Sequence, residues 1–146
     1  MERNTYFDWD PESHSALCVI EDDKGRVFSG TATCHEADYD FESEKTGCEI
    51  AFRRAKIAML QAIRDQDLLP SLRALNQLYY SMKHSNNFNP KSYENRMLQR
   101  QLRFYNFDLA TIKEMLAYER KNLKEYIAGK DKFYNRMRSK RAEQDN

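Results

Sequence analysis

Arginine, aromatic and asparagine side chains recur through the middle of the sequence, and together these residue types can bind a nucleotide. Aromatic rings stack on a base, asparagine amides hydrogen bond to its edge, and guanidinium groups hold phosphate in a bidentate fork. The candidate ligand-binding residues are Arg53, Arg54, Tyr79, Tyr80, Asn89, Arg100 and Arg103. Ordinary helix-surface arginines beside core aromatics would give the same pattern, so the sequence leaves both interpretations open.

A second candidate region is the basic segment from Arg120 to Arg141, in which nine basic and two acidic residues give a net charge of +7. Such a segment attracts polyanions, so it is a candidate for binding nucleic acid or nucleotide phosphates. It could equally be a solvated tail that balances the acidic N-terminal half, in the same subunit or across an interface. Phe133, Tyr134 and Met137 give it enough apolar character for part of it to dock as a helix.

The charged residues are unevenly distributed along the chain. Its 146 residues include 24 lysines and arginines and 23 aspartates and glutamates, for a net charge of +1. The first fifty residues carry 4 basic and 13 acidic side chains, whereas the remainder carries 20 and 10. The net charge of the whole chain therefore indicates no particular class of binding partner. The distribution lets a basic half hold an anion locally while the whole protein stays near neutral.

Motifs for catalysis or metal binding are scarce. The sequence has no glycine-rich phosphate loop, no GxSxG motif and no HExxH motif. No two of its three cysteines and no two of its three histidines are spaced as CxxC or i, i+4, so we expect reduced thiols and no zinc site. The acidic run suits the cap of a following helix better than a metal site: Asp38, Asp40, Glu42 and Glu44. We therefore expect binding without catalysis, with no cofactor and no metal.

The N-terminal part of the chain predicts a β-hairpin. Two strand-like runs between Ser15 and His35 are joined by the acidic segment 21–25, which ends in a glycine that can take positive φ. On one face of the second strand Gly30 and Ala32 offer little side chain, so a helix can approach closely. A lone hairpin is only marginally stable. We therefore expect a third strand, either from residues 6–9 or from a second subunit.

A long helix should follow the hairpin, from about Glu42 to Arg64, with Asp40 or Ser43 as its cap. Small residues recur every three or four positions along it, which lets another backbone come close: Gly47, Ala51, Ala55, Ala58 and Ala62. This helix is the best candidate for the centre of the core.

The rest of the chain predicts further helices with interruptions. Pro70 predicts a kink or short break, because proline cannot donate an amide hydrogen bond and disfavours helix in the residue before it. The asparagine-rich segment 84–90 predicts a loop. Another helical stretch is expected from Ser92, with a bend near Asn106, and a last helix from residue 108 to near residue 129.

These elements predict a helix-dominated α+β fold, with a small N-terminal antiparallel β-sheet packed on several long α-helices. The length suits a single domain, with residues 1–40 as hairpin and acidic connection, 41–129 as helical core, and 130–146 as a basic tail that is flexible or docked. The N-terminus lacks a signal-peptide pattern, and no apolar stretch approaches the ~20 residues of a membrane span. We therefore expect a soluble, cytoplasmic protein that makes no membrane contact.

The segment from Gly30 to Ala55, GTATCHEADYDFESEKTGCEIAFRRA, is similar to a segment common in bacteriophage proteins. Its layout, a β-hairpin followed by an acidic cap and long helices, resembles the phage Thoeris anti-defence sponge family. Of the candidate residues, the resemblance itself implies a ligand-binding role for Arg54. Arg53 would take that role if the helix is rotated so that Arg53 faces the ligand instead. The remaining candidates depend on the residue argument above.

The resemblance implies a homo-oligomeric, non-enzymatic sponge in the cytoplasm of an infected bacterium. Such a protein captures glycocyclic ADP-ribose, the signal made by bacterial TIR-domain defence proteins. Some family members also trap cyclic oligonucleotides at separate sites between subunits. The alternative function is a phage adaptor that binds nucleic acid or a host protein through the basic C-terminal segment.

Overall fold

The protein has a helix-dominated α+β fold, described here by a computed structural model for residues 2–41 and 43–145. The chain forms two compact units. Unit 1 comprises residues 1–59 and 117–146, and unit 2 comprises residues 60–116. The expectation that the chain forms one domain stays a prediction. None of the described helices has a stretch both long and apolar enough to cross a membrane.

The β-sheet of unit 1 has three antiparallel strands in the order β1-β2-β3: β1 (Glu2–Asp10), β2 (Ser15–Asp22) and β3 (Val27–Thr33). The predicted hairpin is confirmed as β2 and β3, and the third strand comes from the chain's own residues 6–9 within β1. The β2–β3 turn is closed at Gly25, whose φ of 77° a residue without a Cβ adopts freely. The Asp22 carboxylate accepts hydrogen bonds from the backbone N–H groups of Lys24 and Arg26 in this turn.

Helix α1 (Glu44–Ala62) packs against the sheet, as the small residues on both elements predict. A Cβ placed on Gly30 would lie only 2.2 Å from the Ala51 carbonyl oxygen, so the helix backbone rests directly on β3. Ala51 and Ala55 are fully buried at this contact. The helix starts two residues after the predicted Glu42, which lies outside the described residues, and Ser43 is its cap: the Ser43 hydroxyl accepts a hydrogen bond from the Thr46 N–H at 3.1 Å.

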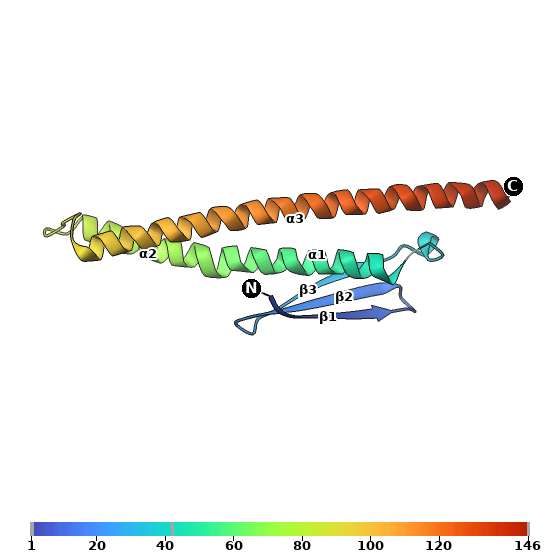
Figure 1. The fold of residues 1–146 in the computed structure, drawn as a ribbon, viewed down its shortest axis with the longest axis horizontal. Helices are drawn as coiled ribbons and strands as arrows, with labels where there is room; N and C mark the ends of the chain where they lie inside the picture. Colours follow the sequence, from blue (N-terminus) through green and yellow to red (C-terminus); the bar gives the residue numbers. More distant parts are fainter. Residues whose placement is uncertain (1, 42, 146) are drawn as a thin grey trace. The chain divides into compact units, whose positions relative to one another are not determined.

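The C-terminal part of helix α3 (Tyr93–Asp145) completes unit 1, with α1 between it and the sheet (Figure 1). The prediction that the last helix ends near Gly129 is wrong. Gly129 does not adopt the left-handed backbone that ends many helices, and the helix continues through the basic segment to Asp145. Across this contact the Lys56 ammonium lies 3.1 Å from the Glu119 carboxylate, which is nearly buried.

Unit 2 holds the helices that follow α1. The regular α-helical pattern is interrupted before Pro70, as predicted, but by a π-helical turn (Ile63–Leu68) and not by a break: the backbone stays helical and continues into α2 (Leu69–Lys83). In this turn the Leu69 N–H donates to the Arg64 carbonyl five residues back, and Pro70 lies in the first turn of α2, where an amide hydrogen is not needed. The predicted loop at 84–90 is present.

Helix α3 then starts at Tyr93 and shows no interruption in unit 2. The predicted new helix start at Asp108 is therefore wrong, whereas the predicted bend near Asn106 stays a prediction. Asp108 is an acceptable residue within a helix when its side chain points to solvent, as its exposure here shows.

Candidate functional site

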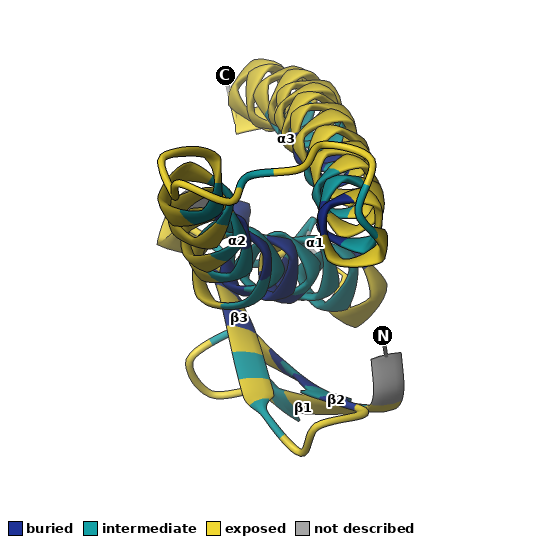
Figure 2. Cartoon of the chain, turned by 90° about the vertical axis from the view of Figure 1, so that its left-hand side faces the viewer, coloured by how far each residue is buried: buried dark blue, intermediate teal, exposed yellow. Residues whose placement is uncertain are grey.

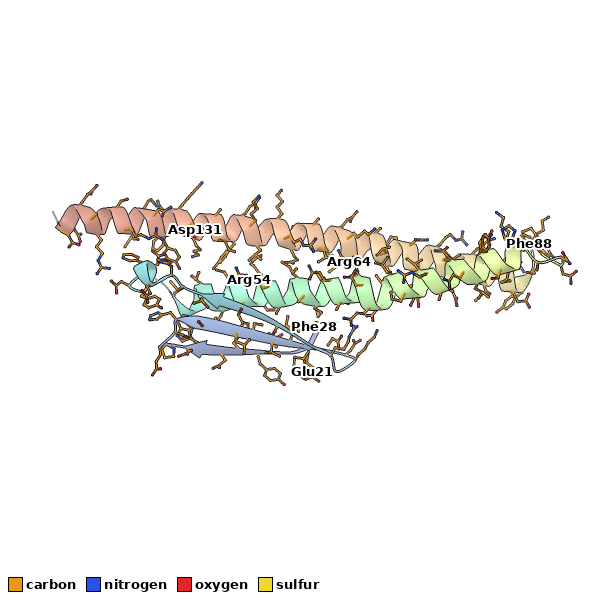
Figure 3. The ribbon with its side chains drawn as sticks, turned by 180° about the vertical axis from the view of Figure 1, so that it is seen from behind. Glu21, Phe28, Arg54, Arg64, Phe88 and Asp131 are labelled. Atoms are coloured by element: carbon orange, nitrogen blue, oxygen red, sulfur yellow. The ribbon has the colours of Figure 1, made fainter. Side chains whose placement is uncertain are left out.

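Unit 1 contains a cavity of about 220 Å³, enclosed by the end of the sheet, the first turns of α1 and the C-terminal part of α3. Its wall combines aromatic rings with cationic groups: Trp9 from β1, Arg54 from α1, and Lys130 and Tyr134 from α3. Figure 3 shows Arg54 on α1 and Asp131 on α3, two of the lining residues. The cavity is therefore built from segments at both ends of the sequence.

The aromatic side of the cavity is fixed by the turn between β1 and β2. His14 has a φ of 51°, an uncommon conformation for a residue other than glycine. Its ring stacks on Tyr39 with 3.7 Å between centroids and meets Trp9 edge-on at 6.4 Å. A Cβ on Gly47 would lie 2.9 Å from the Trp9 ring, so this glycine leaves the space that the indole occupies. The Trp9 ring is thus held between the turn and the start of α1.

The cationic side of the cavity distinguishes the two adjacent arginines of α1. Arg54 lines the cavity and donates one hydrogen bond, from Nη1 to the Thr31 carbonyl at 2.7 Å, which aligns its guanidinium group along β3. Arg53 bonds instead to Glu49 at 2.9 Å and lies over the Tyr126 ring at 5.3 Å. Arg54 is therefore the candidate that can contact a ligand here.

An ion pair connects the acidic segment before α1 to the C-terminal part of α3. Arg138 donates two hydrogen bonds of 2.6 Å to the buried carboxylate of Asp38, and Arg141 pairs with Asp40. The hydrogen bonds from Arg138 lower the pKa of Asp38, against the opposing effect of burial, and Asp38 in turn raises the pKa of Arg138. Tyr134 and Lys130, which lie about one and two turns before Arg138 on α3 respectively, line the cavity.

Two of the four acidic residues that the sequence offered for a metal form ion pairs instead. Asp38 and Asp40 are paired with arginines, and Glu42 lies outside the described residues. Among residues 2–41 and 43–145, no group of three histidine, cysteine, aspartate or glutamate side chains is arranged to hold a metal ion.

The remaining candidates belong to unit 2 and occupy separate places there. Tyr79 meets Phe88 edge-on with 6.5 Å between ring centroids, and Tyr80 lines an open hollow between α2 and α3. Asn89 accepts two hydrogen bonds: its Oδ1 from the Lys91 N–H in the same loop, and its backbone carbonyl from the Asn95 side-chain amide at the start of α3. The last two candidates, Arg100 and Arg103, line a different, shallow hollow on α3.

The cavity also contains residues that sequence reasoning did not select, chiefly Trp9, His14, Lys130 and Tyr134. Lys130 and Tyr134 were recognised as parts of the basic segment. Their position at the cavity could be predicted only if the helix was expected to continue past Gly129. Trp9 was visible only as part of an expected third strand. Tyr134 follows Trp9 by 125 positions, and no pattern in a single sequence shows that the two residues line the same cavity.

No family model, curated protein or solved structure matches this chain. The chemistry of the cavity is therefore argued from its own groups. Rings, two cations and the hydroxyls of Ser43 and Thr46 suit the binding of a base and a phosphate. Cys34 and His35 also line the cavity, and the Cys34 thiol donates to the His35 backbone carbonyl at 3.5 Å.

Proposed function

We propose that unit 1 binds a small phosphate-bearing nucleotide in this cavity and retains it without chemical change. The observation that carries the proposal is the convergence of Trp9, Tyr134, Arg54 and Lys130 on one partly enclosed cavity. Ligand sites are concave, with apolar walls and a few oriented polar groups. Trp9 and Tyr134 supply faces for a base, and Arg54 and Lys130 supply charge for phosphate.

The charge of the cavity matches a small anion. Arg54 and Lys130 contribute two positive charges and Asp131 one negative charge, while the charge of Asp38 is neutralised by Arg138. The resulting surplus of one positive charge suits one phosphate group better than a long polyanion. The Arg54 guanidinium is already aligned by its bond to Thr31, so it loses less conformational freedom when it binds.

The size of the cavity bears on the proposed oligomer. Its volume of about 220 Å³ is below the roughly 300–1,000 Å³ of typical ligand pockets, and it is open on one side. One part of a nucleotide can enter while the rest projects outward. We propose that a second copy of the chain covers the projecting part, so that the binding form is a homo-oligomer.

The ligand that we propose is a cyclic ADP-ribose signal such as glycocyclic ADP-ribose, as the sponge family resemblance implies. Arg54 supports this choice, because it lies in the resembling segment and also lines the cavity. Sequestration requires capture without turnover, inside the cytoplasm of an infected bacterium. Cyclic oligonucleotides at sites between subunits are part of the same proposal.

Trp9 offers a direct test, because it is the single tryptophan of the chain and lines the cavity. Titration with cyclic ADP-ribose isomers should change its emission to saturation, and Arg54→Gln should weaken that response at least about tenfold, since an ionic hydrogen bond is lost. Arg103→Gln, in unit 2, is the matched control and should leave the response unchanged. An unchanged Trp9 emission with every isomer would contradict the proposal.

The absence of turnover is tested separately. Protein incubated with the bound nucleotide is denatured, and the released nucleotide is examined by mass spectrometry. We expect it intact. Conversion that disappears in Cys34→Ala would show instead that the cavity is catalytic.

The alternative adaptor function is supported by the exposed lysines and arginines of the basic segment, among them Lys132, Arg136 and Lys140. It is less well supported than the cavity, because Arg138 and Arg141 of the same segment are already paired with carboxylates. Replacing Lys132, Arg136 and Lys140 together by glutamine tests the adaptor function, and none of the three lines the cavity. Nucleic-acid affinity that survives this replacement would count against the adaptor.

A further inference from the structure

One face of α3 in unit 2 combines three arginines with three exposed aromatic rings. Each member has another member three or four residues away, the spacing that places side chains on one face of a helix: Tyr93, Arg96, Arg100, Arg103, Phe104 and Phe107. We call these six residues the arginine–aromatic face. It is a surface separate from the cavity of unit 1.

The three rings of this face are exposed to an unusual degree for such large apolar side chains. Tyr93 is 66% exposed, Phe104 is 58% exposed and Phe107 is 70% exposed. Figure 2 shows most of α3 in the colour of exposed residues. Rings that are not buried in a core have faces available to a partner.

The arginines of the face are similarly available. Arg96, Arg100 and Arg103 are exposed, and within the described part of the chain none of them is ion-paired to a carboxylate. Arg100 instead lies over the Phe104 ring, with 5.7 Å between its Cζ and the ring centroid, a cation–π contact. In unit 1, by contrast, Arg53 and Arg138 are held by carboxylates.

The charge around the face favours a polyanion. Unit 2 carries eight basic and five acidic residues, a net charge of +3. Between Tyr93 and Phe107 the only carboxylate in the sequence is Glu94, which lies about 100° around the helix from Tyr93. The three arginines span about 10 Å along the helix axis, so they can contact successive phosphates of one strand.

The exposed rings favour single-stranded over double-stranded nucleic acid. In a duplex the base faces are already stacked, whereas a single strand can place its bases on exposed aromatic side chains. A shallow hollow lined by Tyr93, Arg96, Arg100 and Arg103 follows the same face, and it is open rather than enclosed. An open charged face with stacking rings fits an extended strand better than a single small nucleotide.

We propose that the arginine–aromatic face of α3 binds single-stranded nucleic acid, with the arginines on phosphates and the rings on bases. This site is independent of the nucleotide cavity in unit 1. It also differs from the adaptor function assigned to the basic C-terminal segment.

Fluorescence anisotropy with a labelled oligo(dT) of about 15 nucleotides tests the proposal, since single-strand sites span about 4–16 nucleotides. With three phosphates contacted, raising salt from about 50 to about 200 mM should weaken binding about 18-fold. The triple variant Arg96→Gln, Arg100→Gln, Arg103→Gln should abolish both the binding and its salt dependence. A second triple variant, Lys132→Gln, Arg136→Gln, Lys140→Gln, removes the same charge from the basic segment. We expect it to bind within about twofold of wild type, and loss of binding in it would place the strand on the basic segment and overturn the proposal.

The rings are tested by Phe104→Ala with Phe107→Ala, which leave every charge in place. We expect affinity for oligo(dT) to fall at least about fivefold, since each lost stacking contact costs at least that factor. Circular dichroism confirms that the helix is retained. No binding of oligo(dT) by wild type at about 50 mM salt, or full binding by the arginine triple variant, would overturn the proposal. Sedimentation that shows a dimer of the wild type alone, lost in the Phe104 and Phe107 variant, would also overturn it, because the face would then be covered by a second copy.

Discussion

The two units use arginine and aromatic residues in opposite ways. In unit 1 the sheet, α1 and the C-terminal part of α3 form successive layers, and the side chains between them are held by defined partners: Arg54 by the Thr31 carbonyl and Arg138 by Asp38. In unit 2 the same residue types lie on an exposed face of α3. The comparison teaches that layering, not composition, decides whether these residue types enclose a cavity or lie on an exposed face.

The layered packing of unit 1 depends most strongly on Gly30. Replacement by valine should destabilise unit 1 by at least about 3 kcal/mol, because the new Cβ would lie 2.2 Å from the Ala51 carbonyl and 2.5 Å from the Ala55 nitrogen, both backbone atoms that cannot move independently. Urea unfolding followed by Trp9 fluorescence measures this, since Trp9 reports unit 1. A loss below about 1 kcal/mol would show that α1 does not rest on β3.

The nearly buried ion pair between α1 and α3 gives the next largest effect. Lys56→Met should destabilise unit 1 by about 1–3 kcal/mol, because the Glu119 carboxylate would lose its partner while remaining mostly enclosed. Lys56 is one-third exposed, which keeps the expected cost below that of a fully buried pair.

The double variant Lys56→Met, Glu119→Leu is the control. It should recover most of the lost free energy of unfolding, since two apolar side chains can replace a buried pair. Additive losses in the double variant would contradict this account.

The ion pair between Asp38 and Arg138 predicts a pH dependence. Because folding lowers the pKa of Asp38 below its ordinary value of 3.8, the pair's contribution is complete above pH 3.8 and is lost as the pH falls through the lowered pKa. Asp38→Asn should therefore lower the midpoint of thermal unfolding at pH 6. The difference from wild type should shrink towards pH 2.

Arg138→Gln removes the same pair and should show the same convergence at low pH. A difference from wild type that stays constant from pH 6 to pH 2 in either variant would show that the pair does not contribute through its charge.

The smallest predicted effect has the opposite sign. Gly129→Ala should stabilise the protein by about 0.5–1 kcal/mol, because Gly129 is within α3 and a Cβ there would meet no heavy atom within 4 Å. Helix content and unfolding midpoint by circular dichroism measure it. Destabilisation would indicate that α3 ends near residue 129 after all. Comparing the Gly30 and Gly129 substitutions thus distinguishes a glycine that packing requires from one that packing does not require.

Local sequence signals predicted much of unit 1. The turn residues at 21–25 and the small side chains of β3 and α1 predicted the hairpin and its contact with the helix, because each depends on neighbours in sequence. The helix boundaries predicted at Asp108 and Gly129 were wrong for one reason. Each of these residues is compatible with a helix when its particular backbone or side-chain requirement is met, and a single sequence does not show whether it is.

The candidate site was predicted only in part. Arg54 was selected as an arginine able to hold phosphate and as a member of the resembling segment, and it lines the cavity. Trp9 and Tyr134 were missed because only the continuation of α3 past residue 129, fixed by the pairing of Arg138 with Asp38, places them at one cavity. Long-range ion pairs of this kind leave no periodic pattern in the chain.

Calorimetric titration of the full chain with glycocyclic ADP-ribose, carried out on Arg54→Gln and Arg53→Gln in parallel, tests the central claim most directly. The two variants remove the same charge from adjacent positions of α1, but only Arg54 lines the cavity. We predict that wild type and Arg53→Gln bind the nucleotide with similar affinity, while Arg54→Gln binds at least about tenfold more weakly. Equal affinity of the two variants, or no heat with wild type, would contradict the account.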